Sequence, residues 1–271
     1  MIRDKKLINE QIFRCQSVDI NYIEGPANGS NILLLHGGCS RWQSFLPIIS
    51  DLITNFRVYA IDFRGHGKSG RTISYNVQDY VQDTYLFIKE HIKKPTIIFG
   101  NSLGGVVAIM TAAYHPELVR AVIIGDAPIS MKSFRNLIDS QRDFADQIIK
   151  WLRTNQITNI YKKLKDDHFA ESLSLCDPDM LVAMFDQFEF TFREYSINEL
   201  FPLIICPVLV IRGCLERGSL ITDSDMNQAS KLLTSVSQVQ LPNVGHSLME
   251  DKFSVLKEIN FFINALNKSL I

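Results

Sequence analysis

Short and almost unbroken apolar runs recur along the chain, and they restrict its fold more than any other feature of the sequence. They occupy 31–36, 56–62, 95–100, 119–126 and 208–212, and a last strand is predicted at 236–241. Continuous runs of this kind are typical of strands buried on both faces of a parallel sheet. Segments with helical spacing lie between several of them, at 75–92, 103–115 and 222–233. Strand and helix therefore alternate, which predicts an α/β fold with a doubly wound sheet.

The two ends of the chain complete this prediction. Residues 11–24 alternate weakly between apolar and polar side chains, which predicts an antiparallel pair of strands. Residues 253–266 have the pattern of an amphipathic helix that closes the chain. Together with the five runs and the strand at 236–241, they predict a mostly parallel, eight-stranded sheet with helices on both faces.

One region interrupts the alternation. Residues 128–201 have helical texture, no clear strand and many aromatic side chains, which predicts an inserted helical cap. Residues 1–127 and 202–271 would then form the core domain. Three aromatic residues of the insertion have the spacing of one helix face, which we expect to turn toward the sheet and in part to line a pocket. They are Phe185, Phe188 and Phe192.

The composition excludes several classes of partner. Of 271 residues, 46% are hydrophobic, and 28 Lys and Arg against 29 Asp and Glu leave a net charge of -1. Such a chain has no electrostatic reason to bind nucleic acid or an anionic membrane, and no apolar run is long enough to span one. The N-terminus at 1–6 is not followed by the apolar segment of a secretory signal. The five cysteines form no CxxC pair, so we expect reduced thiols, a cytoplasmic location, and neither a metal nor an organic cofactor.

The sharpest local motif is Gly100-Asn101-Ser102-Leu103-Gly104-Gly105, a G-x-S-x-G pattern. It follows a predicted strand and opens a predicted helix. In such a turn the flanking glycines remove side chains that would clash, and the serine hydroxyl is left exposed at a helix N-terminus. A serine placed in this way is a nucleophile if a base accepts its proton. The pattern therefore predicts that Ser102 attacks an acyl carbon.

The base is predicted from its place along the chain. His246 follows the last predicted strand and precedes the final helix, where a base that serves an earlier serine is expected. His91 and His115 lie at predicted helix ends, and His168 lies in a polar run where a solvated side chain is expected. We therefore expect His246 to take the proton of the nucleophile and return it.

The oxyanion of a tetrahedral intermediate needs backbone N–H groups directed at it. Leu103, directly after the serine, offers one at the helix N-terminus. The glycine-containing turn after the run at 31–36 offers the second, from Gly38 or, as the alternative, from Cys39. His36 in the same turn is expected to form structural hydrogen bonds.

Motifs in this order resemble the α/β-hydrolase family, and the resemblance covers nearly the whole chain. They are His36-Gly37-Gly38, the D-x-R-G-x-G-x-S segment at 62–69, G-x-S-x-G at 100–104, P-V-L-V-I-R-G at 207–213, and Gly245-His246. The resemblance implies a helical cap between the sixth and seventh strands, which coincides with 128–201. It also implies that Arg64 and His66 are structural residues that shape the loop beside the active site.

The acid that orients His246 has two candidates. The family often carries it three residues after the glycine that closes the seventh strand, where this chain has Glu216. The other family position is the end of the sixth strand, occupied here by Asp126. We rank Asp126 first, because a rigid strand end holds one imidazole tautomer better than a loop that contains glycine. Asp223 and Asp225 are assigned to the first turn of the following helix.

These residues predict a serine hydrolase that acts on a small or medium apolar ester through an acyl-enzyme. A serine nucleophile, rather than aspartate, argues against epoxide hydrolases and haloalkane dehalogenases. One alternative is hydrolysis of a carbon–carbon bond, as in the similar ring-fission product hydrolases. A basic pocket residue would favour it, and Arg41 is the candidate, although its side chain is interpreted as exposed. The other is a binding or signalling protein of this fold with little turnover. The oligomeric state is left open.

Overall fold

The computed structural model describes residues 8–16 and 18–268 and contains an eight-stranded sheet. Its strands are β1 (Asn9–Arg14), β2 (Asp19–Glu24), β3 (Ser30–Leu35), β4 (Phe56–Ile61), β5 (Thr96–Asn101), β6 (Val119–Gly125), β7 (Val208–Arg212) and β8 (Val236–Gln240). They lie in the order β1-β2-β4-β3-β5-β6-β7-β8, with β2 antiparallel to β1 and β4 and the other pairs parallel. The mostly parallel sheet predicted from the apolar runs is therefore confirmed. The prediction about a signal segment at 1–6 falls outside the described residues.

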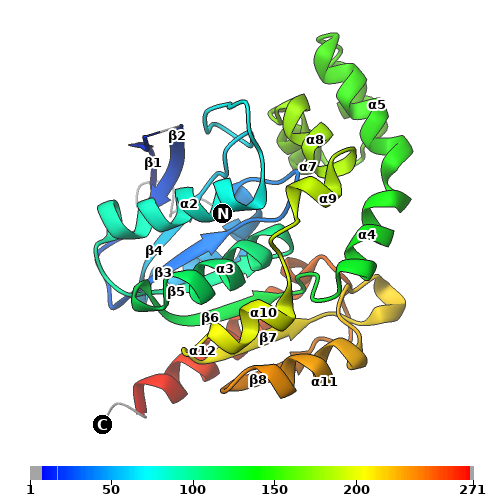
Figure 1. Ribbon diagram of the computed structural model, residues 1–271. Helices are drawn as coiled ribbons and strands as arrows, with labels where there is room; N and C mark the ends of the chain where they lie inside the picture. The colour runs from blue at the N-terminus through cyan, green and yellow to red at the C-terminus, as the bar shows by residue number, and fades with distance from the viewer. Residues whose placement is uncertain (1–7, 17, 269–271) are drawn as a thin grey trace.

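Helices cover both faces of this sheet, as Figure 1 shows. They are α1 (Leu46–Leu52), α2 (Val77–Leu86), α3 (Leu103–Tyr114), α11 (Asp223–Leu232) and α12 (Lys252–Lys268). Leu33 and Leu35 of β3 join a core with α2, α3 and α11, whereas Ile32 and Leu34 join a second core with α1 and α12. Alternate side chains of one strand thus enter opposite cores. This two-sided burial explains why the sequence shows continuous apolar runs rather than alternation.

A helical insertion separates β6 from β7. It consists of α4 (Met131–Ser140), α5 (Arg142–Arg153), α6 (Thr158–Lys163), α7 (Asp167–Ser174), α8 (Pro178–Phe185), α9 (Phe188–Thr191) and α10 (Ile197–Leu200). In Figure 1, α4, α5, α7, α8 and α9 rise beyond the sheet, and α10 returns beside α3. The segment is helical, as its texture predicts. Its separation from 1–127 and 202–271 as a domain of its own stays a prediction.

The expectation that three phenylalanines share one helix face is wrong. The helix α8 ends at Phe185, and α9 begins only at Phe188, because the backbone N–H groups of Asp186 and Gln187 both turn back to one carbonyl, that of Val182. Phe188 and Phe192 do contact each other, with ring centroids 5.0 Å apart. Both rings also lie about 5 Å from Phe134 of α4, at 5.0 and 4.8 Å. These aromatic side chains therefore pack against one another, within the same buried cluster as α2 and α3.

No helix in residues 8–16 and 18–268 is long and apolar enough to cross a membrane. Within the same ranges, no group of three or more His, Cys, Asp or Glu side chains is arranged to hold a metal ion. The five cysteines are all free thiols.

Candidate active site

Ser102 occupies a strained turn between β5 and α3. Its φ of 53° and ψ of −119° are rare for a residue with a side chain, and such conformations are found where the surrounding structure enforces them. A Cβ at Gly100 would lie 2.1 Å from the carbonyl oxygen of Gly104, and one at Gly104 would lie 2.0 Å from that of Leu35. The two glycines of the motif are therefore required by close backbone approach. The serine backbone N–H donates to Gly125 of β6 at 2.9 Å, which fixes the turn to the sheet.

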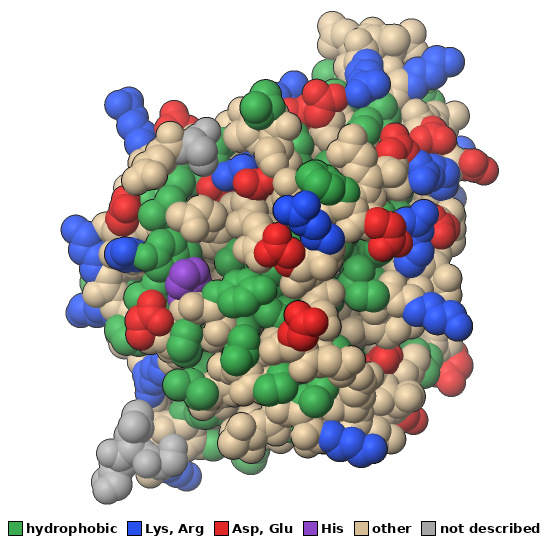
Figure 2. Space-filling model, in the orientation of Figure 1, with side chains coloured by type: hydrophobic (Ala, Val, Ile, Leu, Met, Phe, Trp, Pro, Cys, Tyr) green, Lys and Arg blue, Asp and Glu red, His purple; other side chains and the backbone are tan. Residues whose placement is uncertain are grey.

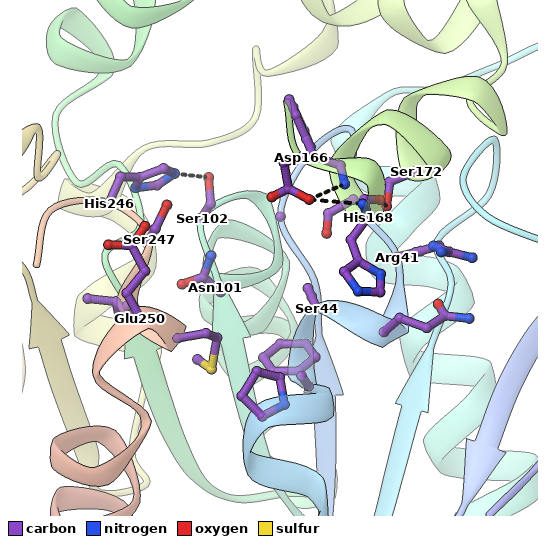
Figure 3. A pocket seen from close by; sticks show the side chains of 18 of the residues that line it. Arg41, Ser44, Asn101, Ser102, Asp166, His168, Ser172, His246, Ser247 and Glu250 are labelled. Carbon is purple, nitrogen blue, oxygen red and sulfur yellow. Dashed lines mark hydrogen bonds between the residues drawn. The ribbon is translucent and has the colours of Figure 1, made fainter. Parts of the chain in front are cut away.

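The structure brings Ser102, His246 and Asp126 into one hydrogen-bonded series. The Ser102 hydroxyl lies 3.0 Å from His246 Nε2, the contact drawn as a dashed line in Figure 3. His246 Nδ1 lies 2.8 Å from Asp126 Oδ2. The imidazole thus has a carboxylate at one nitrogen, which favours a proton there, and a hydroxyl at the other, which can donate to the free lone pair.

Asp126 is fully buried and is held from several sides. Its backbone has a φ of 38°, and its N–H donates to Ile211 of β7 at 2.8 Å. Its carboxylate accepts from the Ser219 hydroxyl at 2.5 Å and from the Leu220 backbone N–H at 3.0 Å, besides its contact with His246. Ser219 and Leu220 belong to the loop after β7. No local pattern in the sequence marks them, because their role depends on β6 and β7 being neighbours in the sheet.

Glu216, the other carboxylate left open by the sequence, lies in that same loop but away from His246. Its side chain is exposed and accepts from the Cys214 thiol at 2.7 Å. This hydrogen bond lowers the pKa of Glu216. The loop therefore contributes donors that hold Asp126, and Asp126 is the carboxylate that contacts His246 in the described structure. Asp223 and Asp225 lie in the first turn of α11, where the sequence places them.

The turn after β3 lies beside the serine. A Cβ at Gly37 would be 3.2 Å from Ser102 Cβ, and one at Gly38 would be 4.0 Å from a side-chain carbon of Leu103. The Cys39 N–H, the alternative oxyanion donor, instead donates to His66 Nε2 at 3.2 Å. This bond occupies the Cys39 N–H and leaves Gly38 as the other candidate donor of the turn, where an added Cβ would first meet Met184 of α8 at 2.9 Å.

Two buried histidines fix this turn. His36 Nε2 accepts from the Phe63 backbone N–H at 3.0 Å, and His66 Nδ1 lies 3.0 Å from the Arg64 carbonyl oxygen. Burial lowers the pKa of His36 to about 4 and that of His66 to about 3, so both rings are neutral near pH 7. Arg64 itself pairs with Asp83 through Nε and Nη2, each at 2.7 Å. All three side chains hold other parts of the fold, which is what the resemblance implies for Arg64 and His66.

A cavity of about 640 Å³ opens over Ser102 and His246. Its walls come from the turn after β3, the serine turn, helix α7 of the insertion and the loop after β8. The lining residues are Gly37, Gly38, Ser40, Arg41, Gln43, Ser44, Phe45, Pro47, Asn101, Ser102, Asp166, His168, Phe169, Ser172, His246, Ser247, Leu248, Met249 and Glu250. Most of these residues are polar by type, although most of the exposed lining surface is apolar. The insertion contributes only one aromatic ring, that of Phe169, so the expectation that Phe185, Phe188 and Phe192 line a pocket is wrong for this cavity.

Two lining residues differ from the sequence interpretation. His168 is exposed, as expected from its polar surroundings, but it faces the cavity because α7 lies over the serine. Arg41, interpreted as exposed, is buried: its side chain is 7% exposed and its Nη2 forms an ion pair with Glu171 of α7. Figure 3 shows Arg41 on the opposite side of the cavity from His246 and Glu250. Neither placement follows from local sequence, since each depends on how the insertion packs on the core.

A family model described as "Alpha/beta hydrolase family" matches residues 32–254, which include Ser102, Asp126 and His246. A 2-(acetamidomethylene)succinate hydrolase from Mesorhizobium japonicum is 26% identical over 270 residues, covering 93% of this chain and 96% of that protein. A serine hydrolase-like protein from Danio rerio is 35% identical over 105 residues, covering 38% of this chain and 32% of that protein, so the chain spans about a third of that relative. The crystal structure of E-2-(acetamidomethylene)succinate hydrolase has a TM-score of 0.75 at 21% identity, covering 95% and 99% of the two chains, and shows the same fold.

Proposed function

Because this chain belongs to the alpha/beta hydrolase family, we propose that it is a serine hydrolase that forms an acyl-enzyme on Ser102. The observation that carries this proposal is the series of contacts from Asp126 through His246 to Ser102, at 2.8 and 3.0 Å. A hydroxyl becomes a useful nucleophile when a neighbouring base accepts its proton as it attacks. The intact series also favours turnover over a role in binding alone.

The reaction follows from these contacts. His246 Nε2 accepts the Ser102 proton while Oγ attacks the carbonyl carbon, and the same proton then passes to the leaving group. Asp126 holds the proton of the other ring nitrogen and stabilises the imidazolium that forms. The backbone N–H groups of Gly38 and Leu103 receive the oxyanion, at a helix N-terminus where negative charge is favourable. Water then attacks the acyl-enzyme with His246 as its base.

The substrate is a small carboxylic ester or amide with polar substituents. The cavity of about 640 Å³ accommodates a molecule of modest size, and its mostly apolar surface carries polar side chains that can form hydrogen bonds. The apolar ester predicted from the aromatic insertion is less well supported, because Phe188 and Phe192 are buried in contact with Phe134. The Mesorhizobium relative supports a polar substrate, since the compound in its name carries an acetamido group and succinate. Hydrolysis of a carbon–carbon bond remains the alternative.

A serine-directed probe tests this function without knowledge of the substrate. We expect a fluorophosphonate to label the wild-type protein on Ser102, and Ser102→Ala to lose both the label and nearly all hydrolysis of activated esters. Ser237→Ala, an exposed serine of β8, is the matched control and should label normally. Labelling of a folded Ser102→Ala variant at the wild-type rate would overturn the proposal, and so would a wild-type protein that is inert to the probe.

A further inference from the structure

Buried polar atoms without a partner gather at the cavity. Among the residues that the structure describes, the buried side-chain nitrogen and oxygen atoms with no hydrogen bond belong to Arg41, Gln43, Asn101 and Arg212. The first three of these residues line the cavity. The unpaired atom of Arg41 is a donor, Nε, whereas those of Gln43 and Asn101 are acceptors, Oε1 and Oδ1. Buried polar atoms are normally paired, so the unpaired Arg41 Nε beside a cavity indicates a ligand that supplies an acceptor.

Arg41 is the charged member of this cluster. Its side chain is 7% exposed, its Nη2 binds Glu171, and its Nε has no partner. Arg64 shows what a filled guanidinium edge looks like, because its Nε and Nη2 each donate to one oxygen of Asp83 at 2.7 Å. On the same edge of Arg41, Nη2 is paired and Nε is not. A carboxylate has the geometry that fills it, since its two oxygens accept parallel N–H donors.

The charges around Arg41 leave room for such a ligand. Glu171 is 48% exposed and can turn toward solvent. Asp166 accepts the backbone N–H groups of His168 and Phe169 and is thereby engaged in capping α7. Glu250 lies on the opposite side of the cavity, beside His246 (Figure 3). Glu10 is engaged by Trp42 Nε1 and Gln43 Nε2, which both donate to it. The end of the cavity at Arg41 thus carries a buried cation whose partner, Glu171, can exchange.

We propose that Arg41 binds a carboxylate on the acyl part of the substrate and exchanges Glu171 for it. This inference rests on the proposed function, since the carboxylate is placed relative to a carbonyl held at Ser102. The substrate class that follows is a carboxylated ester or amide. Arg41 is a specificity residue in this scheme, and Glu171 occupies its guanidinium when no substrate is bound.

Two 4-nitrophenyl esters of adipic acid test the exchange, one with a free distal carboxylate and one with that group methylated. Wild-type protein should have the higher kcat/KM on the free carboxylate. Arg41→Gln should lower that kcat/KM by about tenfold to a hundredfold, the usual effect of a lost charge-assisted hydrogen bond, and change the methylated ester less than about threefold. Arg41→Lys should fall between, because it keeps the charge without the planar fork.

Glu171→Gln distinguishes exchange from a structural ion pair. Both Arg41→Gln and Glu171→Gln break the pair, so a purely structural role would make them act in the same direction on both esters. We expect Glu171→Gln instead to lower the KM for the free carboxylate and to leave the methylated ester unchanged. Parallel losses in the two variants, or equal wild-type rates on both esters, would overturn the inference. If neither ester is hydrolysed and the fluorophosphonate does not react, the proposed function itself fails.

Discussion

The two walls of the cavity are built differently. The core wall carries Ser102 and Asp126 at strand ends, both with positive φ, and Asp126 is fully buried. The opposite wall, helix α7 with its N-cap, presents the exposed side chains Asp166, His168 and Phe169. Close packing makes the first wall rigid, because any added side chain there meets backbone atoms, whereas the second can change without disturbing a core. Under the proposed function, the sheet would therefore fix the chemistry and the insertion would govern the choice of substrate.

Replacing Asp126, the proposed acid on the core wall, should have the largest effect on catalysis while leaving the fold intact. Asp126→Asn should lower kcat on an activated ester by about ten-thousandfold, because the amide no longer enforces the tautomer in which His246 Nε2 accepts a proton. Steady-state kinetics of the folded variant give the value. Glu216→Gln is the matched control, since this exposed carboxylate contacts Cys214 and should be dispensable. A larger loss in Glu216→Gln than in Asp126→Asn would reverse the assignment of the acid.

Low pH should destabilise the fold on the side of the core wall, because two histidines are buried there. The folded pKa values of His36 and His66, about 4 and about 3, are below the usual value of 6.5. Between the folded and the unfolded pKa, the unfolded chain binds more protons than the folded one. The contribution of the two neutral rings to stability is therefore complete above pH 6.5 and is lost as the pH falls toward 4. For each histidine, the free energy of unfolding should fall by about 2 kcal/mol as the pH is lowered from 6.5 to 5.

Urea unfolding at a series of pH values measures this effect. His66→Gln keeps a polar side chain but removes one titrating group, so its stability should fall less steeply with acid than that of the wild type. His168→Gln is the control, because His168 is exposed on the opposite wall. Equal slopes for His66→Gln and the wild type would show that the buried ring does not govern this pH dependence.

The smallest expected effect comes from a change in the wall that α7 forms. Phe169→Ala should change the free energy of unfolding by no more than about 0.5 kcal/mol, as is usual for an exposed side chain. It should still alter the relative kcat/KM of esters with different acyl groups by a fewfold, because the ring lines the cavity. The control is Phe190→Ala, which removes an exposed ring of α9 that is not among the lining residues. Matching changes in ester preference for the two variants would contradict a specific role of α7.

Local sequence determined the sheet, the turn at Ser102 and the place of His246. The apolar runs predict the buried strands because burial on two faces requires continuous apolar character. Gly100 and Gly104 mark the serine turn because no side chain fits between those backbones. Such features depend on residues that are adjacent in sequence, so they can be predicted from the sequence.

Tertiary structure alone decided which distant residues meet. Asp126 and Glu216 follow neighbouring strands, and only the packing of the loop after β7 places Ser219 and Leu220 on Asp126 and turns Glu216 outward. The burial of Arg41 is decided in the same way, by helix α7 settling over the turn after β3. These contacts join segments that lie far apart in sequence, and their free energy depends on how whole elements pack, which no local pattern records.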